Sequence, residues 1–220
     1  MLKKSVVALS AALLAVCFAG TAAADIVCPD SSYCEVTFQN TYPTGSQFAG
    51  DPYDYLTVDA AGTGESFATF GIDIRVYLKN CQGEPLIGIP PQEIVMFNSN
   101  LCICPGGGAS DAGTDSNGCA TWTGTLAAGG CVDVIDVYAD GVFICTLEDA
   151  GGRTVKLNST DQAQNGTSPC FTDASDLAAF AAVLGQTAIG NICFDFNEFD
   201  ETIDASDLAF FAAALGAACQ

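Results

Sequence analysis

The sequence predicts a mainly β protein in which an antiparallel β-sandwich is followed by a small α-helical domain. Through residues 25–157, short stretches of alternating apolar and polar residues are separated by turns rich in Gly, Asn and Asp, a pattern typical of a sandwich. Farther along the chain, the thirteen residues Asp173–Gly185 return as Asp204–Gly216 with two substitutions. A repeat this close indicates the duplication of one structural unit. Each copy starts and ends with residues typical of helix termini, which predicts that the unit is helical.

Residues 1–24 have the features of a secretory signal peptide. Lys3 and Lys4 precede an apolar run over residues 5–20, and Ala22–Ala24 supplies the small residues of a cleavage site. We expect cleavage after Ala24 and a mature protein that is secreted, either extracellular or at the cell surface. No other stretch is long and apolar enough to cross a membrane. The predicted domains are therefore the signal peptide (1–24), the β domain (25–157) and the helical domain (158–220).

The strands of the β domain are predicted from periodicity. Every second residue from Phe70 to Leu78 is apolar, which predicts a half-buried strand. A shorter strand is expected at 94–97 and another at 120–126. Strands at 132–138 and 142–147 flank Asp140-Gly141, a favoured two-residue hairpin turn.

The segment 35–39 fits two interpretations. It can form a strand of its own sheet, or it can pair with the exposed sheet edge of a neighbouring molecule and so build a fibre. The strand within its own sheet is the more common arrangement.

The duplicated segment predicts two short amphipathic helices. Each copy begins with Asp-Ala-Ser-Asp, a helix-start signature, and ends with Leu-Gly, a helix stop. In the first copy Leu177, Phe180, Ala181 and Leu184 fall at helical spacing, and the second copy repeats them. The two helices therefore have matching apolar faces and are expected to pack on each other.

Acidic loops precede both helices and suggest calcium, because Ca²⁺ takes six to eight oxygen ligands. The ligands expected in the second loop are Asp195, Asn197, Asp200, Asp204 and Asp207, and those in the first loop are Asp161, Asn165, Asp173 and Asp176. The second loop is one residue longer than the EF-hand pattern, and Gly166–Cys170 interrupts the first. A simpler interpretation is that the acids at each helix start only cap the helix. The two interpretations are compatible.

These loops and helices resemble the dockerin repeat, a duplicated half EF-hand in which a calcium loop is followed by one helix. The resemblance covers about residues 158–220. It implies that Ca²⁺ is the cofactor and that a cohesin-type domain is a candidate partner. The family contacts its partner at loop positions that correspond here to Ala174, Ser175, Ala205 and Ser206.

Two stretches of the β domain resemble bacterial immunoglobulin-like domains of surface adhesins. Val76–Ile89 is similar to a strand, a Gly-x-Pro turn and the strand that follows, and Thr114–Trp122 is similar to a Thr-Asp-x-Asn-Gly-x-Ala turn and strand. The resemblance implies an immunoglobulin-like sandwich with a structural or adhesive role.

Charge and cysteine content narrow the class of function. Without the leader, the six basic residues fall to four, against 26 acidic ones, and the formal charge is −22. Nucleic acid and anionic lipid are therefore poor partners. Eleven cysteines remain after cleavage, which in a secreted chain predicts disulfides and one unpaired thiol. A local Cys28–Cys34 bridge is plausible, and Cys170, Cys193 and Cys219 are expected to staple the helical pair.

Three functions are consistent with these features. The first is a secreted, non-catalytic structural or adhesive surface protein with a calcium-stabilised tail, which assembles into a filament or layer with neighbouring subunits. The second is a module that docks to a cohesin-type partner. The third is a glycoside hydrolase that uses carboxylates, since the chain has no histidine and nucleophile schemes that need one are excluded. The first is preferred, and the protein is expected not to be an enzyme.

Overall fold

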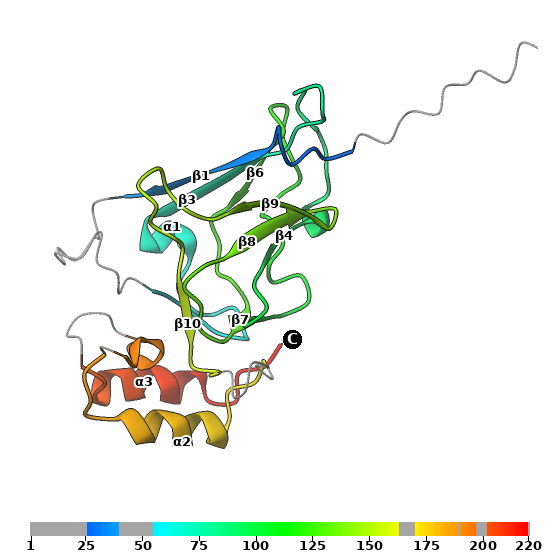
Figure 1. The fold of residues 1–220 in the computed structure, drawn as a ribbon. Helices are drawn as coiled ribbons and strands as arrows, with labels where there is room; N and C mark the ends of the chain where they lie inside the picture. The colour runs from blue at the N-terminus through cyan, green and yellow to red at the C-terminus, as the bar shows by residue number, and fades with distance from the viewer. Residues whose placement is uncertain (1–25, 40–54, 163–169, 189, 197–201, 220) are drawn as a thin grey trace, which may run out of the picture.

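The computed structural model describes residues 26–39, 55–162, 170–188, 190–196 and 202–219 (Figure 1). Strands outnumber helices in these ranges, so the protein is mainly β as expected. The strands are β1 (Tyr33–Phe38), β2 (Leu56–Val58), β3 (Ile72–Tyr77), β4 (Ile94–Phe97), β5 (Cys102–Ile103), β6 (Cys119–Trp122), β7 (Ala128–Gly129), β8 (Asp136–Ala139), β9 (Val142–Thr146) and β10 (Leu157–Ser159). The helices are α1 (Phe67–Phe70), α2 (Ala174–Val183) and α3 (Ala205–Ala214), with short 3-10 turns η1 (Pro91–Glu93) and η3 (Ile192–Phe194).

Two three-stranded antiparallel sheets form the body of the protein. Their strand orders are β1-β3-β6 and β4-β8-β9. Buried residues of both sheets, among them Ile74, Trp122, Ile94 and Val137, belong to one hydrophobic cluster. Each sheet therefore presents one apolar face to a shared core, as a two-layer sandwich requires.

The predicted alternation is confirmed in β3, where Ile72, Ile74 and Val76 are buried. The strand starts two residues later than predicted because Phe70 ends the short helix α1. Ser66 caps this helix at its start, and Gly71 ends it in the left-handed conformation at φ 81°. A capped turn and a left-handed glycine stop a strand from extending backwards.

The predicted hairpin is confirmed between β8 and β9. Asp140 and Gly141 both have positive φ, 49° and 74°, as the tight primed turns of hairpins require. Strand β4 has the predicted bounds. The strand predicted at 132–138 is displaced to 136–139, and the one predicted at 120–126 is shorter, at 119–122.

Strand β1 contains the N-terminal segment for which two interpretations were open. It pairs antiparallel with β3 over six residues, from Tyr33 opposite Tyr77 to Phe38 opposite Ile72. The segment therefore completes a sheet of its own domain. An additional cross-link from Cys34 to Cys145 joins it to β9.

Gly118 closes the turn before β6, and substitution of this residue tests whether the turn packs as described. Its φ is +72°, and a Cβ atom there would lie 2.5 Å from the Leu78 carbonyl oxygen. We expect Gly118→Ala to lower the free energy of unfolding by about 2 kcal/mol or more, since strain and a backbone clash add. Urea denaturation measures this loss. The control is Gly83→Ala, because exposed Gly83 also has a positive φ but no atom lies near its would-be Cβ. The control therefore shows the cost of backbone strain without the clash.

The helical pair lies against one end of the β body (Figure 1). The chain enters it through β10, which pairs parallel with β2. The boundary predicted between residues 157 and 158 falls inside this strand. Residues 158–161 are fully or almost fully buried, so the connection is part of the packed structure.

Three disulfides join the helical pair to the β body. The five bridges of the described residues are Cys28–Cys81, Cys34–Cys145, Cys102–Cys170, Cys104–Cys219 and Cys131–Cys193. The predicted Cys28–Cys34 bridge is wrong, and so is a staple made among the three C-terminal cysteines. Each of those three is bonded to a cysteine of the body instead. Cys119 is the unpaired thiol of the described residues, which confirms the expected odd cysteine.

Candidate metal centres

Both helices of the duplicated unit begin with the same capping box. In α2 the Ser175 backbone N–H donates to the Asp173 carboxylate at 2.6 Å, and the Asp173 N–H donates to Asp176 at 2.8 Å. In α3 the corresponding distances, for Ser206 to Asp204 and for Asp204 to Asp207, are again 2.6 and 2.8 Å. The capping interpretation is therefore confirmed for both copies.

The second acid of each box does more than cap. Asp176 and Asp207 are 1% and 0% exposed, whereas a capping acid needs no burial. The other oxygen of each carboxylate accepts a backbone N–H from the start of its loop, from Gln162 to Asp176 at 3.0 Å and from Phe196 to Asp207 at 2.7 Å. Each of these carboxylates therefore closes an acidic loop onto its helix.

This matched pair of hydrogen bonds aligns the two loops. Gln162 and Phe196 occupy equivalent positions, and so Asp161 is the counterpart of Asp195. Both of these loop-start acids are buried, at 0% and 3% exposure. The segment Gly166–Cys170 makes the first loop longer than the second, but the hydrogen bonds that close the two loops are equivalent. Asn165, Asn197 and Asp200, three of the predicted ligands, lie outside the described residues.

The first loop brings negative charges together in a buried place. Burial raises the pKa of the Asp176 carboxyl, and the charges of Asp161 and Asp173 raise it further, against the hydrogen bonds that lower it. Hydrogen bonds from Ser175 lower the pKa of Asp173, and those from Ser206 lower that of Asp204. A carboxylate with a raised pKa is one whose charge is poorly compensated, and a bound cation would supply that compensation.

The donor set fits a hard cation such as Ca²⁺. Asp161 and Asp176 in the first loop, and Asp195 and Asp207 in the second, supply carboxylate oxygens, the atoms that Ca²⁺ prefers. Each oxygen that accepts one backbone N–H keeps a second lone pair, so the observed hydrogen bonds are compatible with coordination. The residues present therefore suit the metal that the dockerin resemblance implies.

The two copies also exchange short backbone pairings. The Gly185 N–H donates to the Ile203 carbonyl at 2.7 Å, and the Ile203 N–H donates to Gln186 at 2.9 Å. Reciprocally, Gly216 donates to Thr172 at 2.9 Å and Thr172 to Ala217 at 3.0 Å. The end of each helix is thus bonded to the loop of the other copy. These short pairings couple the two loops.

The core between the helices is narrower than the sequence predicts. Phe180 and Phe211 pack together with ring centroids 5.7 Å apart, and Phe196 and Ile203 complete the cluster. Leu177 and Leu184, which were expected on the same apolar face, are exposed. The helices are rich in alanine, and the loop residues Phe196 and Ile203 fill the space beside the two aromatic rings.

Two polar residues that sequence reasoning missed fasten the second loop to the body. The Asn158 amide donates to the Asp195 carbonyl at 2.7 Å, and the Thr57 hydroxyl donates to the Phe196 carbonyl at 3.4 Å. Asn158 is fully buried, and its carbonyl oxygen has no hydrogen-bond partner among the described residues. In the sequence, Asn158 stands out only as the first residue of a glycosylation sequon, Asn-Ser-Thr. That pattern does not indicate a contact with the second loop.

The predicted partner-contact residues lie at the surface. Ala174 and Ser175 of α2, and Ala205 and Ser206 of α3, are all exposed. They occupy the first turns of two helices that run side by side in Figure 1. Each serine hydroxyl also donates to the capping aspartate of its own helix at 2.6 Å.

No model of a known protein family matches the chain, and no curated protein or solved structure is significantly similar to it. No helix in the described ranges combines the length and the hydropathy of a membrane-spanning segment. The function must therefore be argued from the geometry of this structure.

Proposed function

We propose that this protein is a secreted, non-catalytic structural or adhesive surface protein, with an immunoglobulin-like β-sandwich and a calcium-stabilised dockerin-like tail. The observation that carries the proposal is the set of three disulfides between the two parts, Cys102–Cys170, Cys104–Cys219 and Cys131–Cys193. Such bridges form and persist in oxidising, extracellular surroundings. They turn a β body and a helical pair into one cross-linked unit.

A row of aromatic side chains supports contact with other subunits. Phe97, Tyr138 and Phe143 come from neighbouring strands β4, β8 and β9, with ring centroids 5.7 Å apart at each step. Phe97 and Phe143 are 49% and 46% exposed. Clustered exposed aromatic groups mark interaction surfaces, and the occupant we favour is a second copy of this chain.

The double substitution Phe97→Ser/Phe143→Ser is expected to weaken this self-association at least tenfold, because both rings would lose their buried contact area in the assembly. Analytical ultracentrifugation and electron microscopy of the mature protein, with and without calcium, measure it. Exposed Ile87→Ser is the matched control, since it removes a surface hydrophobic group outside the row. A wild-type protein that stays monomeric at every concentration would contradict the proposal.

The exposed Ala-Ser pairs favour one alternative, docking to a cohesin-type domain. Both pairs are available on the surface at once, although three disulfides hold the module to the body instead of a flexible linker. Pull-down with cohesin domains tests this alternative, with Ser175→Arg/Ser206→Arg as the variant that should abolish capture. Capture by the wild type and not by the variant would favour docking over assembly.

A further inference from the structure

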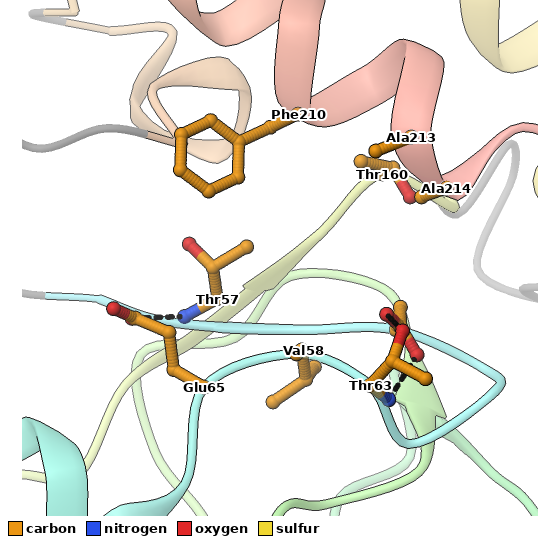
Figure 2. Close-up of a pocket in the computed structure, with 10 residues that line it drawn as sticks. Thr57, Val58, Thr63, Glu65, Thr160, Phe210, Ala213 and Ala214 are labelled. Carbon is orange, nitrogen blue, oxygen red and sulfur yellow. Dashed lines mark hydrogen bonds between the residues drawn. The ribbon is translucent and has the colours of Figure 1, made fainter.

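A cavity of about 250 Å³ lies between the β body and helix α3 (Figure 2). The body contributes Thr57–Asp59 and the loop Thr63–Glu65, and Thr160, which directly follows β10, also lines the cavity. Helix α3 contributes Phe210, Ala213 and Ala214. The cavity is thus built jointly by two parts of the protein that three disulfides hold in place.

The two copies of the helix differ only where α3 meets this cavity. Phe210 replaces Ala179 of the first copy, and Ala214 replaces Val183. Both replaced positions line the cavity. One change adds an aromatic wall and the other removes two methyl groups, so together they shape an opening. If the two helices had diverged only to pack tightly, the substitutions in α3 would be expected to fill the cavity.

Carboxylates and one aromatic ring give the cavity its chemistry. Asp59 and Glu65 line it, and none of the ten described lining residues is basic. The described basic side chains lie elsewhere: Arg75 pairs with Asp73, Arg153 pairs with Asp149, and the ammonium groups of Lys79 and Lys156 lie over Tyr33 and Tyr55. The described lining therefore carries two acidic side chains and no basic side chain.

Phe210 completes the site. Its side chain projects from α3 on the side of the cavity where Thr57 and Glu65 lie (Figure 2), and it is 45% exposed. An aromatic face beside a carboxylate is the usual surrounding of a bound ammonium group, since the ring and the acid both attract a cation. Burial raises the pKa of Glu65, against the hydrogen bond from the Thr57 N–H that lowers it.

The body side of the cavity is held rigidly. The Asp59 carboxylate accepts the Thr63 N–H at 2.8 Å and the Thr63 hydroxyl at 2.6 Å. Gly64 lies so close to β2 that a Cβ atom would be 2.6 Å from the Thr57 carbonyl oxygen. The Thr57 N–H donates to Glu65 at 3.4 Å. A site fixed in this way loses little entropy when a ligand binds.

We propose that this cavity binds the alkylammonium group of an organic amine, with Glu65 and Asp59 as the anionic partners and Phe210 as the aromatic wall. The same chemistry can come from a free amine or from a lysine side chain of another protein. The cavity and its charges do not depend on calcium, so the proposal stands apart from the proposed function.

Titration of the mature, oxidised protein tests the proposal, with n-butylammonium chloride as the free amine, Nα-acetyl-lysine methylamide as the lysine side chain and 1-butanol as the neutral analogue. NMR shifts of the Phe210 ring and the Thr57 amide report binding. We expect saturation with a dissociation constant on the order of 0.1–1 mM for the amines and none for the alcohol. Tighter binding of the lysine derivative assigns the site to a protein partner, and tighter binding of n-butylammonium assigns it to free amines.

Variants that borrow the sequence of α2 are the matched tests, because the first copy already folds with those residues. Phe210→Ala is expected to weaken binding about fivefold, and Ala214→Val, which narrows the cavity, is expected to weaken it as well. Glu65→Gln should weaken it at least tenfold, while Ala179→Phe on α2 should leave it unchanged. The proposal would be overturned if 1-butanol bound as tightly as the amines. It would also be overturned if neutral sugars, and not amines, saturated the cavity, or if the amines shifted only NMR signals of the acidic loops.

Discussion

Removal of the Cys104–Cys219 bridge is expected to lower the free energy of unfolding by about 2–5 kcal/mol. The bridge spans 115 residues, and a cross-link that closes so long a loop restricts the unfolded chain most. For a protein of this size the melting temperature should fall by about 5–15 °C. The variant is Cys104→Ser/Cys219→Ser, measured by urea denaturation at a fixed calcium concentration.

Cys119→Ser is the matched control, because Cys119 has no disulfide partner. Burial and the charge of Asp115 raise the pKa of its thiol, so it stays protonated and exchanges slowly with the bridges. The control should change the stability by less than about 1 kcal/mol. Peptide mapping without reduction must also recover the five pairs. A Cys28–Cys34 peptide, or equal stability of the double variant and the wild type, would contradict this bridge pattern.

The disulfide pattern is the part of the fold that the sequence could least predict. Cys102 and Cys104 are two residues apart, yet they bond to Cys170, which precedes α2 in the sequence, and to Cys219, which follows α3. The antiparallel bridge between Phe171 and Ala218 brings these two distant cysteines close together. Connectivity depends on which segments the tertiary structure brings together, and spacing along the chain carries no such information. The elements that local chemistry dictates, β3 and the Asp140-Gly141 hairpin, were predicted because alternation and turn preference act within a few residues.

The candidate metal centres show the same division. The capping boxes were visible as Asp-Ala-Ser-Asp, because a cap is a local interaction. The burial of Asp176 and Asp207 was not visible, because it depends on the loop ends folding back to them. Nor does the sequence reveal the bonds from Asn158 and Thr57 to the second loop, which cross 37 and 139 residues. The exposed leucines have a related cause, since Phe196 and Ile203 of the loop fill space that a simple helix pair would give to them.

Calcium is expected to stabilise the mature protein by about 1.5–3 kcal/mol per occupied loop at 10 mM, if each loop binds with a dissociation constant of about 0.1–1 mM. With two loops the melting temperature should rise by about 6–20 °C over that in chelator. The physical reason is the pair of buried acids at the ends of each loop, Asp161 with Asp176 and Asp195 with Asp207, whose negative charge a divalent cation would neutralise. Differential scanning calorimetry with calcium and with chelator measures the shift, and isothermal titration counts the sites.

Asp207→Asn and Asp176→Asn separate the loops. Each carboxylate accepts two backbone N–H groups, so an amide turns one acceptor into a donor and lowers stability even without calcium. The informative quantity is therefore the difference between the stability in calcium and the stability in chelator. Each variant should roughly halve this difference, while exposed Glu93→Gln should leave it unchanged.

If the wild type shows no such difference, the acids serve only as helix caps, and cross-linking by disulfides alone holds the helical pair. If only Asp207→Asn reduces it, the longer first loop is structural and the second is the calcium site. Equal losses would mean that the extra residues of the first loop leave its ligand positions intact, as the matched Gln162 and Phe196 hydrogen bonds predict.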